Sequence, residues 1–209
     1  MDYVVKGGNA YGMLRIALNA NELIYARENA IIAFSPQIVF TKSQNGGFLR
    51  RLARKFSGAH LDMQQINATE DKSWVMLAAP MAGSVTGIDL HGKNVLVIKE
   101  VFLAAARNVQ TNGRLHTLDR EKFIHENFQV IKFSGDGVVM LCATGSVEMM
   151  NLLQDQPIRI HPDHLIAWEE SLVFSEPDRG FITITGPGRL WLQTRKHNNL
   201  KDGNKSANS

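Results

Sequence analysis

The sequence predicts an all-β protein of stacked antiparallel sheets, arranged like a sandwich or a barrel. The segment 12–18 alternates in character along its length. Leu14, Ile16 and Leu18 share one face of it, which is the period of a half-buried strand. Many short apolar segments separated by turn-forming residues indicate the same fold class. A third observation, an ordered set of landmarks that occurs three times, indicates that one β-unit is used repeatedly.

Further strands are expected in order along the chain, at residues 23–26, 30–34, 86–89, 95–98, 181–185 and 189–194. Residues 19–21 (Asn-Ala-Asn) and 89–94 are rich in turn formers. The Gly-Asp-Gly segment 135–137 is predicted to open a hairpin, because these residues tolerate positive φ. The last two strands are predicted to pair with each other around the Gly-Pro-Gly segment 186–188.

Three stretches share the same landmarks in the same order. Each contains a glycine, then a leucine, then an apolar strand residue, and ends in an apolar tetrad. The glycines are Gly12, Gly83 and Gly145, the leucines are Leu18, Leu90 and Leu152, the strand residues are Ile24, Val95 and Ile158, and the tetrads are 31–34, 102–105 and 165–168. We expect one β-domain over 1–195 with repeats at about 10–40, 80–110 and 140–175. Coincidence among the short strands of a β-protein is the alternative.

The charge is unevenly distributed along the 209 residues. The formal net charge is only +3, and the 44% hydrophobic content is enough for a core, which excludes a largely disordered chain. Residues 42–58 carry five basic side chains and no acidic one, and residues 195–209 carry four basic side chains and one acidic one. The rest of the chain is therefore mildly acidic, at 3 − 5 − 3 = −5. The polar segment 196–209 is predicted to be a disordered tail.

Two stretches depart from the strand pattern. Residues 48–56 have the spacing of a short amphipathic helix with a basic face formed by Arg50, Arg51, Arg54 and Lys55. That face is a candidate for binding anionic lipid head groups or the phosphates of nucleic acid. The alternative is that the apolar face packs on the β-body or on another subunit and leaves the charges solvated. A second helix is expected over 118–128.

The sequence contains no recognisable catalytic arrangement. Phosphate-binding loops and serine nucleophile elbows are missing, and the single cysteine, Cys142, lies in an apolar run typical of a core residue. His161 and His164, followed by Glu169 and Glu170, are weak candidates for a metal site if a turn at 162–163 brings them together. A surface hairpin is the alternative. We expect no cofactor.

Several motifs together resemble one family. They are the glycine pair 46–47 before the basic helix, the Ala-Pro pair 79–80, the segments 88–104 and 135–145, His-Leu-Ile-Ala-Trp at 164–168, and Gly-Pro-Gly-Arg-Leu-Trp-Leu-Gln-Thr at 186–194. Over about residues 3–195 the chain resembles the family named for altered inheritance of mitochondria, protein twenty-four of that series, a domain of unknown function. The resemblance implies a fold like that of the tryptophan RNA-binding attenuation protein, and homo-oligomers such as trimers. It implies no established activity. Mitochondrial members are associated with organisation of the inner membrane.

The chain also departs from the family pattern. Residues 112–128 replace a glycine-rich stretch and a strand, and Asn29 or Ala30 replaces the glycine usual before the first tetrad. These differences indicate a divergent member.

From these observations we expect a non-enzymatic, homo-oligomeric scaffold or binding protein, cytoplasmic or peripheral at an anionic membrane surface. A nucleic-acid-binding module and a metal-dependent hydrolase are the alternatives. The sequence shows neither a secretory signal at its start nor an apolar run of membrane-spanning length.

Overall fold

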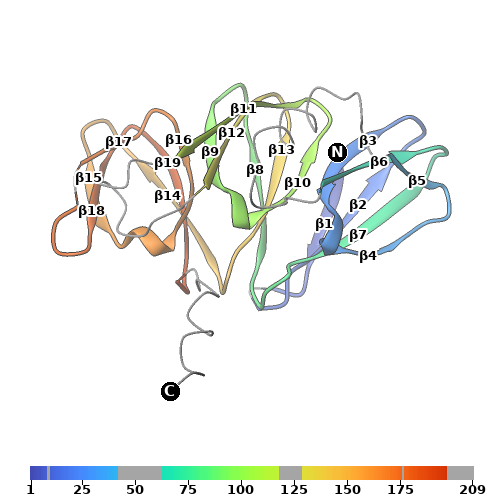
Figure 1. Ribbon diagram of the computed structural model, residues 1–209, viewed down its shortest axis with the longest axis horizontal. Coiled ribbons are helices and arrows are strands. Elements are labelled where there is room, and N and C mark those ends of the chain that lie inside the picture. Colours follow the sequence, from blue (N-terminus) through green and yellow to red (C-terminus); the bar gives the residue numbers. More distant parts are fainter. Residues whose placement is uncertain (9, 42–62, 118–128, 176, 197–209) are drawn as a thin grey trace, which may run out of the picture.

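The structure, a computed structural model, describes residues 1–8, 10–41, 63–117, 129–175 and 177–196 (Figure 1). The protein is built almost entirely of β-strands, as the sequence predicts. The described helical segments are three short 3₁₀ turns, Glu28–Ala30, Lys99–Val101 and Pro162–His164. In the described ranges no helix is long and apolar enough to cross a membrane.

After β1 (Asp2–Lys6), the strands follow one another in three groups of six. The first group is β2 (Met13–Leu18), β3 (Leu23–Arg27), β4 (Ile31–Phe34), β5 (Ile38–Thr41), β6 (Met63–Ala68) and β7 (Ser73–Ala78). The second is β8 (Val85–Asp89), β9 (Val95–Ile98), β10 (Phe102–Ala106), β11 (Val109–Thr117), β12 (Gln129–Gly135) and β13 (Val138–Cys142). The third is β14 (Val147–Leu152), β15 (Pro157–Ile160), β16 (Leu165–Glu169), β17 (Val173–Phe174), β18 (Ile182–Thr185) and β19 (Gly188–Gln193).

The described strands form four antiparallel sheets, arranged along the long axis of the molecule (Figure 1). Their strand orders are β1-β2-β7-β4, β5-β6-β3-β10-β13-β8, β11-β12-β9-β16-β19-β14 and β15-β18-β17. The two six-stranded sheets each combine strands of two successive groups, through the pairs β3·β10 and β9·β16. Strand pairing therefore joins the first group to the second, and the second to the third.

Each group of six strands is paired internally by the same scheme. The sixth strand lies between the first and third, and the fifth lies between the second and fourth. In each group a 3₁₀ turn precedes the third strand. The pairing of that strand with the sixth then shifts register within the apolar tetrad, between Ile31 and Ala33, Phe102 and Ala104, or Leu165 and Ala167. Such a shift marks a β-bulge or irregularity, which bends the strand locally.

The turn positions were predicted correctly, but two of the predicted pairings are wrong. Gly135 and Gly137 have positive φ, as expected for the turn between β12 and β13. However, β12 pairs with β9 and β11, whereas β13 pairs with β8 and β10. Likewise, β18 and β19 belong to different sheets. These tight turns carry the chain from one sheet to another. The turn-forming residues therefore predicted where the chain reverses, but not which strands pair with each other.

The core consists of two clusters of buried apolar residues. The larger one includes Phe102 and Phe133, whose rings stack with centroids 5.1 Å apart. The smaller one includes Cys142, whose Sγ lies 3.4 Å from the carbonyl oxygen of Val101 as a hydrogen-bond donor. Burial raises the pKa of this thiol to about 11. Cys142 is thus a buried core residue, as its apolar neighbours predicted.

The three landmark glycines lie next to one another. Parallel bridges connect Tyr11 with Gly83 and Gly83 with Gly145. The N–H of Gly12 donates to the carbonyl oxygen of Gly83 at 2.7 Å, and the N–H of Ser84 donates to that of Gly145 at 2.8 Å. A Cβ on Gly83 would lie 1.7 Å from the carbonyl oxygen of Ala143. Glycine is therefore required here by the close approach of two backbones.

Candidate functional site

An open pocket of about 720 Å³ lies where four segments meet, at residues 92–94, 151–154, 169–171 and 187–188. The segments come from the second and third strand groups. Glu169, the last residue of β16, forms part of its wall, and the side chain of Glu169 is only 3% exposed. A carboxylate buried to this extent needs partners that replace its lost hydration.

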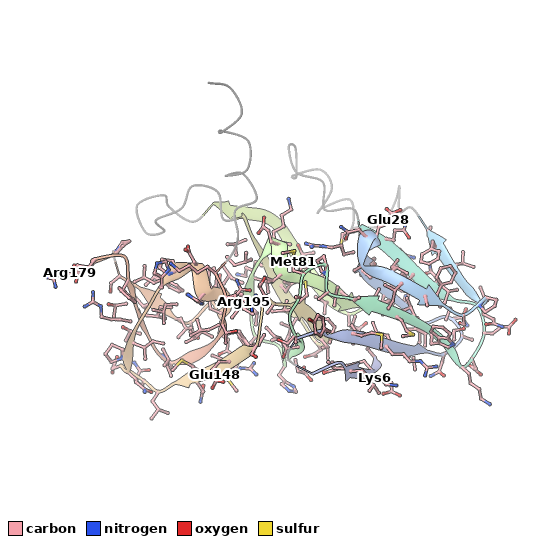
Figure 2. All side chains as sticks on the ribbon, turned by 90° about the horizontal axis from the view of Figure 1, so that it is seen from below. Lys6, Glu28, Met81, Glu148, Arg179 and Arg195 are labelled. Carbon is pink, nitrogen blue, oxygen red and sulfur yellow. The ribbon has the colours of Figure 1, made fainter. Side chains whose placement is uncertain are left out.

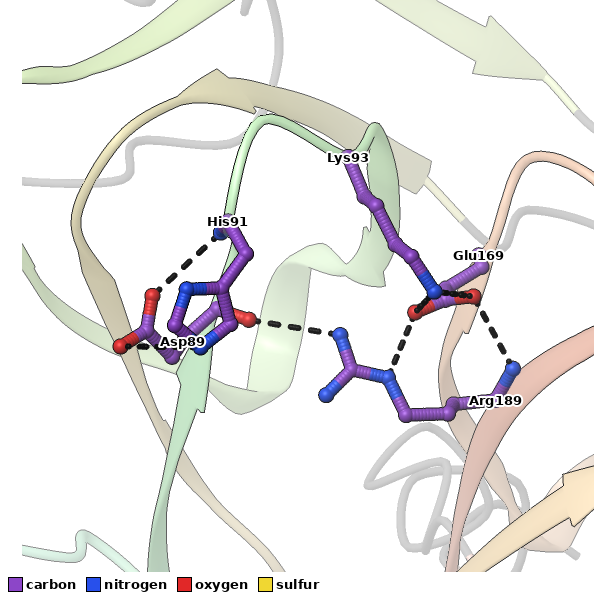
Figure 3. Close-up of polar contacts among 5 residues, drawn as sticks. All are labelled: Asp89, His91, Lys93, Glu169 and Arg189. Atoms are coloured by element: carbon purple, nitrogen blue, oxygen red, sulfur yellow. Dashed lines mark hydrogen bonds and ion pairs between the residues drawn. The ribbon is translucent and has the colours of Figure 1, made fainter.

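Two cations provide those partners (Figure 3). The Nζ of Lys93 lies 3.1 and 3.0 Å from the two carboxylate oxygens of Glu169. The Nε of Arg189 donates to Oε1 at 2.5 Å, and the backbone N–H of Arg189 donates to Oε2 at 3.2 Å. Lys93 follows β8, Glu169 ends β16 and Arg189 is the second residue of β19. The cluster therefore ties the turn between β8 and β9 to the sheet that contains β16 and β19.

Arg189 extends the network to the end of β8. Its Nη2 donates to the carbonyl oxygen of Asp89 at 3.3 Å (Figure 3), and its guanidinium lies 5.3 Å from the ring centroid of Trp191. Asp89 in turn accepts a hydrogen bond from the backbone N–H of His91, and its carboxylate lies 3.5 Å from Nε2 of His91. The His91 and Asp89 side chains are largely solvent-exposed, so this outer pair is worth little to stability.

The pKa of Glu169 reflects two opposing effects. Burial raises the pKa, and the hydrogen bonds from Arg189 and Lys93 lower it. The hydrogen bonds prevail, so the pKa lies below the ordinary value for glutamate. Glu169 is therefore ionised at neutral pH and acts as an acceptor for the two cations rather than as a proton donor.

The neighbouring Glu170 is also held by partners. Its carboxylate accepts hydrogen bonds from Nδ2 of Asn94 at 2.8 Å and from Nζ of Lys132 at 2.5 and 2.7 Å. Both carboxylates of the pocket are thus engaged by protein groups. The Lys93 side chain is 56% exposed and has three N–H donors. The pocket therefore offers a ligand hydrogen-bond donors from Lys93, beside two carboxylates that already have protein partners.

The predicted weak metal pair is brought together only in part. The 3₁₀ turn Pro162–His164 places the rings of His161 and His164 with centroids 5.9 Å apart. Nδ1 of His164 lies 2.7 Å from the carbonyl oxygen of Gln193, which requires that nitrogen to carry the proton and donate it. Within the described ranges, no group of three or more potential ligands is arranged to hold a metal ion.

The carboxylates that the sequence placed beside these histidines have other partners. Glu169 and Glu170 contact cations of β19, of β12 and of the turn before β9. Within the histidine turn, the nearby carboxylate is that of Asp163, whose Oδ2 lies 3.6 Å from Nδ1 of His161. The histidines and the two glutamates therefore belong to different environments.

The basic residues that the sequence singled out lie outside the described residues. These are Arg50, Arg51, Arg54 and Lys55. The segment 118–128, predicted to be helical, lies outside them as well, and of the predicted tail only residue 196 is described.

Sequence reasoning missed the cluster of Lys93, Glu169 and Arg189. Lys93 and Glu169 are 76 residues apart, and Glu169 and Arg189 are 20 apart. No local spacing rule connects such positions. The one available signal was an acidic residue within the apolar segment 165–169, because a buried strand residue that ionises needs a cation nearby.

Comparisons with known proteins place this fold. The crystal structure of protein SPYM3_0169 from Streptococcus pyogenes, a structural-genomics target, is similar with a TM-score of 0.72 and 18% sequence identity, covering 93% of this chain and 94% of that one. At this identity the likeness shows the fold alone. A search of curated proteins finds no match. Residues 3–195 match the family described as "Mitochondrial biogenesis AIM24", as the sequence motifs suggested. The chain belongs to this family, whose function is uncharacterised.

Proposed function

We propose that this protein is a non-enzymatic scaffold that assembles from several copies of itself and binds an anionic surface through residues 48–56. Its body consists of three copies of one six-strand unit. Membership in a family linked to mitochondrial biogenesis, without a known enzymatic activity, is consistent with such a role.

The observation that carries the proposal is the way the three strand groups are joined. Each group pairs internally by the same scheme, and successive groups join through one strand of each, in β3·β10 and β9·β16. This is the organisation of a modular array, in which each unit stabilises the next. Among the described strands, the array ends at both ends in a strand with one open edge, which is suited to further addition of units.

The polar cluster supports a structural rather than a chemical role for the pocket. Glu169 has a lowered pKa and contacts two cations, so it does not match the raised pKa that a general acid needs at neutral pH. The ion pairs link the second strand group to the third. They therefore support the rigidity that a scaffold requires.

The proposed surface contact rests on charge and spacing in the sequence. Arg50, Arg51, Arg54 and Lys55 fall on one face of the expected helix, within a stretch without acidic residues. Each basic side chain near an anionic membrane contributes roughly 1 kcal/mol of attraction. Several copies in one assembly multiply that reversible attraction through avidity.

Multi-angle light scattering of the full chain tests the assembly. We expect a mass at least twice the 23.3 kDa of one chain at micromolar concentration. A mass of one chain over the whole accessible concentration range overturns the scaffold proposal.

Flotation with anionic phosphatidylserine vesicles tests the surface contact. We expect the full chain to float, and the alanine variant of Arg50, Arg51, Arg54 and Lys55 to remain in solution. The matched control replaces four other basic residues of the C-terminal segment with alanine, Arg195, Lys196, Lys201 and Lys205. Equal flotation of the wild type and the 50–55 variant refutes the proposed membrane contact. Binding of the wild type to single-stranded RNA or duplex DNA at low salt, without flotation, favours the nucleic-acid alternative.

A further inference from the structure

We propose that copies of this chain associate head to tail, with β15 of one copy pairing antiparallel to the free edge of β4 in the next. The inference rests on the proposed self-assembly and specifies the strands and the register that produce it. It follows from a comparison of the two junctions within the chain with the two ends of the molecule.

Inside the chain, the third strand of one group always pairs with the second strand of the group before it. Thus β10 pairs with β3, and β16 pairs with β9. In the first group the equivalent third strand is β4, which pairs only with β7 among the described strands. In the third group the equivalent second strand is β15, whose one partner among the strands that the structure describes is β18. Among the described strands, β4 and β15 are therefore the two strands that such a junction would pair, and each has an open edge.

A single chain does not bring these halves together. In Figure 1, β15 and β18 lie at one end of the long axis, and β4 and β5 lie at the other. In Figure 2, Arg179, which precedes β18, lies at one end of the molecule, whereas Glu28, just before β4, lies in the other half. A second copy is the partner that presents the missing strand in the required orientation.

These two edges differ from the edges of the equivalent strands in the other groups. The fourth strand is an edge strand in every group (β5, β11 and β17), and the first strand is one in the second and third groups (β8 and β14), whereas β1 covers the first strand of the first group. Of the described third strands only β4 has an open edge, and of the described second strands only β15 has one.

Side-chain exposure at β4 differs from that at its internal equivalents. Ile32 is 54% exposed, while the equivalent Leu103 and Ile166 are each 0% exposed. Phe34 is 45% exposed, whereas Ala105 at the equivalent position is 0% exposed and Trp168 is 3% exposed. Two large exposed apolar side chains beside the open edge of β4 favour association, because exposed apolar surface and open strand edges are the features through which β-proteins associate.

The internal junctions also define the register of the proposed contact. Ala104 lies opposite Ala26, and Ala167 lies opposite Val97. Counting back from the tetrads, the residue equivalent to Ala26 and Val97 is Ile160, and the residue equivalent to Ala104 and Ala167 is Ala33. In the assembly, Ala33 therefore faces Ile160 of the preceding copy.

The two following pairs are Phe34 with Arg159 and Ser35 with Ile158. The ladder ends there, because Pro36 has no N–H to continue it. At the internal junction of β9 and β16, by contrast, the N–H of Glu170, which is equivalent to Pro36, donates to the carbonyl oxygen of Asn94 at 3.0 Å. The contact between copies is thus shorter by one hydrogen bond than the junction within the chain.

Backbone direction at β4 fits this register. The N–H of Ser35 donates to the carbonyl oxygen of Trp74 on β7 at 2.9 Å. Hydrogen-bonding groups of successive strand residues point to opposite sides, so those of Phe34 point to the open edge. Phe34 and Arg159 then form a directly opposed pair, with Cα atoms about 5.5 Å apart, which lies within the range that a disulfide bridges.

A cysteine cross-linking experiment with two separate variants tests both the strands and the polarity. One sample carries Phe34→Cys, the other carries Arg159→Cys, and the native Cys142 is buried in both. We expect a covalent dimer under mild oxidation when the two variants are mixed, and none when either is oxidised alone. A head-to-tail contact is heterologous, which means that it joins two different surfaces. Position 34 of one chain therefore does not lie against position 34 of another, and the same holds for position 159. The matched control replaces Phe34→Cys with Val39→Cys on β5, which is 48% exposed but lies on a different edge.

The outcomes separate this inference from the proposed self-assembly. Cross-linking of Phe34→Cys with itself, or equal cross-linking of the Val39→Cys control, overturns the head-to-tail register. A mass of several chains in light scattering without any cross-link in the mixture also overturns it, while leaving the self-assembly intact. A mass of one chain for the wild type overturns both. Circular dichroism melting of each variant confirms that it is folded before its result is used.

Discussion

Glu169 and Arg189 are joined by two hydrogen bonds, one from the guanidinium Nε at 2.5 Å and one from the backbone N–H at 3.2 Å. This contact fixes the start of β19 against the end of β16. Lys93 adds a third group from the turn that follows β8, so one carboxylate holds three segments together. The contact between Glu169 and Arg189 therefore serves to hold these segments together rather than to perform chemistry in the pocket.

Replacing Glu169 with glutamine is expected to destabilise the protein. The variant keeps the shape of the side chain but removes the charge, and it leaves Arg189 and Lys93 without their counter-ion. Because both cations retain access to water, we expect a loss of about 1–3 kcal/mol in the free energy of unfolding, measured by urea denaturation. The control is Glu170→Gln, whose half-exposed carboxylate should cost at most about 1 kcal/mol. Equal losses in the two variants contradict the assigned role of Glu169.

The contribution of Glu169 is also expected to depend on pH. Its pKa in the folded protein lies below the ordinary value, so the folded state favours the ionised form. The stabilisation is fully present above about pH 4.3, the ordinary pKa of a glutamate side chain, and is lost as the pH falls through the lower folded-state pKa. The difference in unfolding free energy between wild type and Glu169→Gln should therefore shrink in acid. A constant difference from pH 7 to pH 3 contradicts this explanation.

Gly83→Ala is expected to be strongly destabilising, because the added Cβ meets the carbonyl oxygen of Ala143 at 1.7 Å. That atom belongs to a backbone and cannot move aside as a flexible side chain can. We expect a loss of about 3 kcal/mol in thermal or urea unfolding, at the upper end of the range for overpacking. The control is Gly8→Ala, which has φ +60° but open space around the new Cβ and should cost about 1–2 kcal/mol. A smaller loss at Gly83 than at Gly8 is the contrary result.

Much of the strand pattern could be predicted from the sequence because it depends on local rules. The alternation around Leu14 and Ile16 depends on neighbouring residues alone, and so do the positive φ angles of the turn glycines. These local features correctly predicted where strands and turns lie. Which strands pair is a long-range property. The turn at Gly135 was correctly placed, yet β12 and β13 belong to different sheets, because a tight turn fits a connection between sheets as well as a hairpin.

The candidate site divides in the same way. The sequence offered a turn at 162–163 as the condition for bringing His161 and His164 together, and the structure contains a 3₁₀ turn at Pro162–His164. The cluster of Lys93, Glu169 and Arg189 depends on how β16 is enclosed by β9 and β19. That arrangement follows from pairing between strand groups, which no local pattern encodes.

The Cys142 thiol is expected to react only when the protein opens. Burial raises the pKa of this thiol to about 11, so thiolate is scarce at neutral pH, and the sulfur is shielded from reagents. We expect Ellman's reagent to label the native protein far more slowly than the urea-unfolded chain, with a rate that follows the opening equilibrium. The matched comparison is Phe34→Cys, whose thiol on the exposed edge of β4 should react rapidly in dilute solution. Rapid labelling of Cys142 in the folded wild type contradicts its placement in the core. In the assembled state, protection of the cysteine at position 34 should increase with protein concentration, because β15 of the preceding copy covers that edge.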